Sequence, residues 1–154
     1  MKNFYKSYLP HKKKEILLVM IQFIIIFFNF KNLISTSYLS TNIYLNILGK
    51  ILIISGFISL IISVKDLGMN ISPFPTPLKN ANLVTFGFYK WISHPIYYST
   101  ILISVGILIK NMNIFNLILS IILIIIFKFK IKLEEDYLRK KYKNYQFYKK
   151  DLII

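Results

Sequence analysis

Hydrophobic residues divide the chain into four apolar segments separated by polar loops. The first two, residues 16–30 with an extension to 34 and residues 43–64, can each reach the roughly 20 residues that a membrane-spanning helix needs. The other two, residues 96–109 and 114–127, are shorter, and such lengths taken alone also suit buried or re-entrant helices. The pattern predicts an all-α integral membrane protein, a bundle of about four transmembrane helices.

The flanks lengthen the two short segments. Tyr97 and Tyr98 are aromatic residues of the kind that lie at a membrane interface, and residues 110–113 leave room only for a tight antiparallel turn. Lysines beyond the last apolar segment can snorkel toward water from a helix that continues, so we expect this helix to extend into a cytoplasmic C-terminal helical tail. These lysines are Lys128, Lys130 and Lys132.

The composition is that of a protein embedded in lipid. Of the 154 residues 55% are hydrophobic and the mean hydropathy is +0.55, and so short a chain forms one domain, residues 1–154. The absence of cysteine excludes disulfides, thiolate metal ligands and cysteine nucleophiles, and two histidines are too few for a conventional zinc site, so we expect no metal. The 20 basic residues outnumber the 6 acidic ones, but they gather beside apolar segments, which favours a bilayer over nucleic acid as the partner.

The placement of lysines predicts the orientation in the membrane. Lysines are frequent in the N-terminal residues, in the long loop 65–95 and after residue 127, whereas the two opposite loops hold little more than Lys31 and Lys110. The positive-inside rule then places both termini in the cytoplasm. We expect a protein of a bacterial cytoplasmic membrane in which the long loop and the C-terminal tail lie on the same side.

The end of the long loop concentrates candidate binding groups. His94 precedes Pro95, so its backbone is biased toward an extended conformation and Pro95 suits the first turn of the third helix. A single interfacial histidine needs no function. Gly87, however, allows a close backbone approach, and Tyr89 and Tyr97 offer ring faces and hydroxyl groups. Together these residues indicate a binding site at the start of this helix.

Two adjacent carboxylates follow the last apolar segment. Glu134 and Glu135 are interpreted as inward-facing groups, which are costly near a membrane without a cationic partner, whereas Asp136 is interpreted as a surface charge. They fall on a stripe that keeps helical spacing beyond residue 127. The apolar members of this stripe are Ile131, Leu138, Tyr142 and Tyr145.

Taken together, these motifs resemble the isoprenylcysteine carboxyl methyltransferase family, which is related to the phospholipid methyltransferases. The series is Gly87-x-Tyr89, His94-Pro95-x-Tyr97, an apolar hairpin, Glu134-Glu135-x-x-Leu138 and a tyrosine-rich tail, and it covers about residues 67–148. The resemblance implies methyl transfer from the cofactor S-adenosylmethionine to a lipidated or lipid-like acceptor, such as the carboxylate of a prenylated cysteine. It implies no catalytic residue, and the cofactor-binding residues that it implies are Tyr89, His94, Pro95, Tyr97, Glu134 and Glu135.

One position departs from the family pattern. The family usually has an arginine immediately before His-Pro, whereas this chain has Ser93. Lys90, about one helical turn earlier, is a candidate substitute, although lysine cannot reproduce the bidentate fork of arginine. The departure leaves open how an anionic group would be held there.

The residues leave the acceptor open. A carboxylate is already ionised near neutral pH and needs no base, whereas an amine must first lose a proton, for which His94 is the nearby candidate. The residues suit the cofactor with either acceptor, because aromatic faces and carboxylates both favour the sulfonium cation of S-adenosylmethionine. The alternatives are a phospholipid N-methyltransferase, a non-catalytic membrane protein that retains the fold, and a membrane reductase with a similar hairpin.

Overall fold

The structure is a computed structural model that describes residues 13–34 and 42–153. Within these two ranges every regular element is a helix, so the all-α prediction is confirmed for this part of the chain. The elements are α1 (Lys13–Ile34), α2 (Ile43–Leu67), the 3-10 turns η2 (Gly68–Asn70) and η3 (Gly87–Lys90), α3 (Pro95–Asn111), α4 (Ile114–Lys141) and α5 (Tyr145–Lys150).

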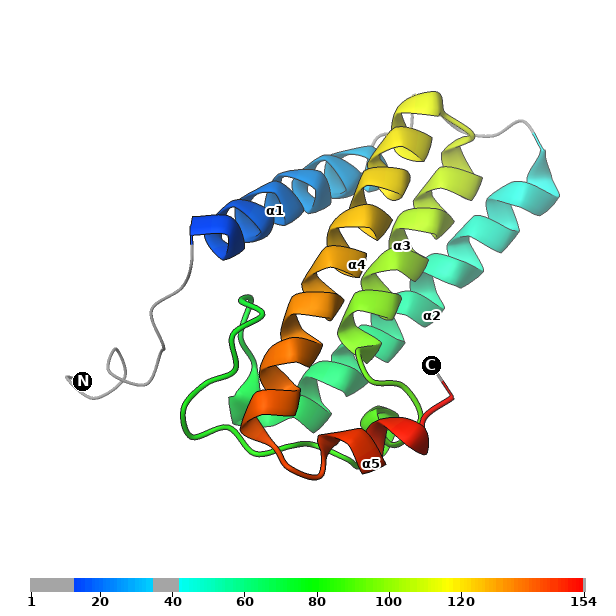
Figure 1. Cartoon of the computed structure of the whole chain (residues 1–154). Helices are drawn as coiled ribbons and strands as arrows, with labels where there is room; N and C mark the ends of the chain where they lie inside the picture. Colours follow the sequence, from blue (N-terminus) through cyan, green and yellow to red (C-terminus); the bar gives the residue numbers. More distant parts are fainter. Residues whose placement is uncertain (1–12, 35–41, 154) are drawn as a thin grey trace.

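Three of the helices form a bundle with α3 in the middle. Figure 1 shows α2, α3 and α4 side by side, with α1 crossing them obliquely against α4, and with the α2–α3 loop and α5 at one end. Within the part of the chain that the structure describes, two helical stretches are long and apolar enough to cross a membrane, Ile43–Asn70 and Ile114–Lys141. The four-span topology stays a prediction.

Small residues bring α2 and α3 into backbone contact. A Cβ atom added to Gly49 would lie 2.7 Å from the carbonyl oxygen of Gly106, and one added to Gly106 would lie 2.9 Å from that of Gly49. Along the same seam Ser99 Oγ donates to Ser59 Oγ at 2.8 Å. Small residues are the usual means of helix association in lipid, because lipid tails are as apolar as the side chains and give no hydrophobic driving force.

Helices α1, α3 and α4 are joined by a chain of buried polar side chains. Ser104 Oγ of α3 lies 3.1 Å from Asn29 Oδ1 of α1 and 2.8 Å from Ser120 Oγ of α4. These hydrogen bonds satisfy polar groups that water cannot reach. The apolar core around them consists of Ile25, Leu119, Leu123, Ile126 and Phe127.

The tight hairpin between the last two long helices is confirmed. Helix α3 ends at Asn111, and Met112 adopts the left-handed conformation with φ of 47°. Asn113 then caps α4, its side-chain oxygen accepting from the backbone N–H of Phe115 at 2.8 Å. From there α4 continues past Phe127 to Lys141, as the flanking residues predicted.

The C-terminal part differs from the prediction at two points. The helical stripe does not continue to Tyr145, because α4 ends at Lys141 and Tyr145 begins the separate helix α5. The expected snorkelling is wrong for Lys130, which is wholly buried, while Lys128 and Lys132 are exposed. A polar environment inside the bundle therefore takes the place of water for Lys130.

The predicted orientation can be tested with single introduced cysteines. We expect a membrane-impermeant maleimide to label Met112→Cys in intact cells, but not Asn80→Cys or Asn144→Cys, because the predicted orientation places only the first on the outer side. Met112 is preferable to Asn111, since Met112 is 61% exposed and Asn111 only 4%. Ser37, in the other outer loop, lies outside the described residues.

The chain has no native cysteine, so each label reports one position. Permeabilised cells serve as the control, in which all three variants should react. Labelling of Asn80→Cys in intact cells would contradict the orientation.

Candidate functional site

His94 lies between two carboxylates of α4 at the start of α3. Its Nδ1 is 3.6 Å from Oε2 of Glu134, and its Nε2 is 3.7 Å from Oε1 of Glu135. The residue is 5% exposed. Pro95 occupies the first turn of α3, as predicted, whereas His94, with φ of −132° and ψ of 60°, is neither helical nor in the expected extended conformation. Two successive residues of one helix thus reach both edges of one imidazole.

Tyr97 holds the imidazole from the side of α3. Its ring stacks on His94 with centroids 5.6 Å apart and on Phe127 with centroids 4.7 Å apart. Its hydroxyl donates to Oε2 of Glu134 at 2.9 Å. The stack and this hydrogen bond orient both His94 and Glu134.

Glu135 connects the site to the C-terminal tail. Lys149 Nζ donates a hydrogen bond to its Oε1, and a nitrogen of Arg139, four residues further along α4, lies 3.5 Å from Oε2. Nearby, Tyr148 Oη donates to the carbonyl oxygen of Tyr89 at 2.6 Å. These contacts fasten α5 beneath the start of α3.

A cavity of about 450 Å³ lies beside His94, Tyr97 and Glu134. Two of its apolar lining residues are about half exposed, Phe23 of α1 at 53% and Ile71 of the α2–α3 loop at 47%, so we infer that the cavity opens beside them. The cavity therefore has a charged, aromatic interior and an apolar mouth.

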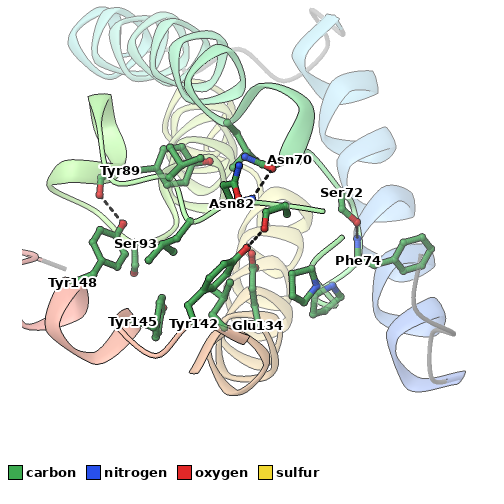
Figure 2. Close-up of a pocket in the computed structure, with 17 residues that line it drawn as sticks. Asn70, Ser72, Phe74, Asn82, Tyr89, Ser93, Glu134, Tyr142, Tyr145 and Tyr148 are labelled. Carbon is green, nitrogen blue, oxygen red and sulfur yellow. Dashed lines mark hydrogen bonds between the residues drawn. The ribbon is translucent and has the colours of Figure 1, made fainter. Parts of the chain in front are cut away.

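A smaller pocket of about 80 Å³ adjoins the cavity under the tail. Figure 2 shows Tyr142, Tyr145 and Tyr148 of the tail lining it together with Asn70 and Asn82 of the loop. Tyr142 Oη donates to the carbonyl oxygen of a loop residue, so the tail and the loop form its walls together. The two spaces share the lining residues Leu67, Ser72, Tyr89, Ser93 and Glu134.

Lys130 is the cavity residue that the sequence reasoning missed. It donates to the side-chain oxygen of Gln22 and, at 2.9 Å, to the carbonyl oxygen of Pro73, and its ammonium lies 5.2 Å from the centre of the Tyr97 ring. Two signals pointed to it. Lys130 precedes Glu134 by four residues, which places both on one helix face, and Gln22 is a polar residue inside an apolar segment.

The structure brings four of the six predicted site residues to the cavity, namely Tyr89, His94, Tyr97 and Glu134. Pro95 and Glu135 are buried but line neither the cavity nor the adjoining pocket. For all six residues, contact with a cofactor stays a prediction.

Lys90 does not replace the arginine of the family pattern inside the cavity. It is exposed, and its ammonium lies over the Trp91 ring, 5.4 Å from the ring centre. The lysine that lines the cavity is Lys130. Ser93, the departing residue itself, lines both spaces.

The two carboxylates determine the charge of His94. Burial on its own lowers the pKa of the imidazole, but Glu134 and Glu135 outweigh this effect and raise the pKa to about 9. At neutral pH the ring is therefore an imidazolium, which donates hydrogen bonds and cannot accept a proton.

A sequence model of the phospholipid methyltransferase family matches residues 44–145. The chain belongs to this family. The matched range runs from α2 to the start of α5 and contains every predicted site residue. The family includes the isoprenylcysteine carboxyl methyltransferases, and membership supports a methyltransferase that acts on lipid-like substrates. Searches of curated proteins and of solved structures give no match.

The raised pKa of His94 predicts a pH-dependent stability. The folded state holds the proton more tightly than the unfolded state, whose imidazole has a pKa of about 6.5. The stabilisation is therefore complete below about pH 6.5 and is lost as pH rises through about 9, an effect on the order of 3 kcal/mol. Thermal unfolding of the purified protein at a series of pH values should show this decline, and His94→Gln should remove it. An equal decline in both proteins would contradict the assignment.

Proposed function

We propose that the protein is an S-adenosylmethionine-dependent methyltransferase of a bacterial cytoplasmic membrane that methylates the carboxylate of an isoprenylcysteine-type lipid. The observation that carries the proposal is His94, held as a cation between Glu134 and Glu135 at a cavity with an apolar mouth. Methyltransferases of this family typically use S-adenosylmethionine, which supports the cofactor.

The residues around the cavity fit this cofactor. A volume of about 450 Å³ lies within the usual range for small-molecule sites. Glu134 and the faces of Tyr89 and Tyr97 suit a sulfonium and an ammonium group. Tyr145 Oη, in the adjoining pocket, is buried with no hydrogen-bond partner among the described residues and is available to a ligand. When bound, the cofactor supplies an electrophilic methyl group.

The state of His94 favours a carboxylate acceptor over an amine. An amine must lose a proton before it attacks, but the imidazolium already carries its proton over the neutral pH range. A carboxylate is ionised in that range and needs no base. Its apolar chain would lie toward Phe23 and Ile71, where the cavity opens.

Conservative changes at the carboxylates test the cofactor site. Glu134→Gln should weaken the binding of S-adenosylmethionine about ten-fold or more, because it removes a charge that lines the cavity. Asp136→Asn, an exposed neighbour on the same helix, is the matched control and should bind normally. Equilibrium binding to detergent-purified protein measures both. Equal losses in the two variants would show that a general charge effect operates, and an absence of binding in the native protein would favour the non-catalytic alternative.

The acceptor is tested by following labelled methyl groups. Label should enter an N-acetyl farnesylcysteine and change little in rate between about pH 6 and 8, because neither the acceptor carboxylate nor His94 titrates there. The family description favours phospholipid N-methylation as the second candidate. Label found only in phosphatidylethanolamine, at a rate that rises with pH, would establish that candidate instead.

A further inference from the structure

We propose that Lys130 binds the anionic head of the acceptor lipid, a carboxylate or a phosphate, and thereby selects anionic lipids for this cavity. The inference rests on the proposed function in that the bound lipid is the methyl acceptor. It assigns a specificity residue that the motifs of the sequence did not contain.

The burial of Lys130 is the first observation. A lysine that ends an apolar helix normally extends its ammonium to water, as the exposed Lys128 and Lys132 on either side do. Lys130 is 0% exposed, and a buried ammonium is costly unless an anion lies nearby. Among the described residues no carboxylate forms an ion pair with it. The carboxylate that favours its charge is that of Glu134, one helical turn further along α4, and this group also faces His94.

The hydrogen-bonding capacity of the ammonium is the second observation. Lysine has three N–H donors. Neutral oxygens of Gln22 and Pro73 accept two of them, and the ring face of Tyr97 attracts the charge without compensating it fully. Lys130 lines the cavity, so the third donor is the one that the proposal assigns to an anionic oxygen of a ligand.

The order of charges along α4 is the third observation. Lys130 and Glu134 lie one helical turn apart and both line the cavity, so a positive and a negative group stand side by side on one rigid element. The cationic methyl donor suits Glu134, and an anionic acceptor suits Lys130. The apolar mouth at Phe23 and Ile71 leaves space for the tail of such a lipid.

The competing explanation is purely structural. Through Gln22 and Pro73, Lys130 fastens α1 and the proline-rich loop to α4. A fastening residue affects the binding of every ligand equally, whereas an anion-binding residue affects charged ligands and leaves their neutral analogues unchanged. Matched pairs of ligands therefore separate the two explanations.

The test measures lipid binding by the full-length protein in detergent. One pair is N-acetyl farnesylcysteine and its carboxamide, and the other is lysophosphatidic acid and the corresponding monoacylglycerol. We expect the native protein to bind at least one anionic member about ten-fold or more tightly than its neutral partner, as one charged hydrogen bond provides. Lys130→Met should remove this preference, Lys130→Arg should retain part of it, and the exposed-site control Lys132→Met should retain all of it.

Each outcome decides the proposal. A preference that persists in Lys130→Met, or its absence from the native protein with both pairs, would overturn it. A Lys130-dependent preference for the phosphate pair alone supports Lys130 as the anion site but overturns the carboxylate acceptor proposed above. Failure to bind S-adenosylmethionine, with the lipid preference intact, overturns the methyltransferase function alone. Lys130→Gln keeps a donor without the charge and replaces Lys130→Met if thermal unfolding shows that the latter does not fold.

Discussion

The contact of His94 with two successive carboxylates is the constraint on which the rest of the site depends. Glu134 and Glu135 reach the two nitrogens of one ring, so the start of α3 is fixed against the end of α4. From Glu135 the charge network extends to Lys149 and holds the tail, and from Glu134 a hydrogen bond orients Tyr97. Because the imidazole is buried, these few polar contacts are stronger than they would be in water. Loop, tail and helix ends are thereby organised around one positive charge.

Local patterns predicted the helices and the candidate site to a large extent. Apolar runs, the proline at position 95 and the short connection near Asn113 each determine the structure of their own neighbourhood, so the helix starts and the α3–α4 hairpin could be predicted from them. The order of the motifs around the hairpin also indicated the family, because the short motifs that contain His94 and Glu134 can be recognised from neighbouring residues alone.

Long-range contacts explain what the sequence did not predict. The hydrogen-bond partners of Lys130 lie 57 and 108 residues away along the chain, at Pro73 and Gln22, and no periodicity in the neighbourhood of Lys130 reports them. The end of α4 is a similar case. Helical spacing continues through Tyr145, but the chain turns after Lys141 so that α5 can pack beneath η3 and the loop. Tertiary contacts override the local pattern in both places.

The close contact of α2 and α3 at two glycines limits where a lipid chain can pass between the helices. Backbone atoms at Gly49 and Gly106 approach so closely that even one added carbon finds no space, so a hydrocarbon chain cannot pass between the two helices at this level. The cavity instead opens beside α1, at Phe23 and Ile71. Under the proposed function, side chains of α1 would therefore be among the first that an acceptor lipid contacts on its way to His94.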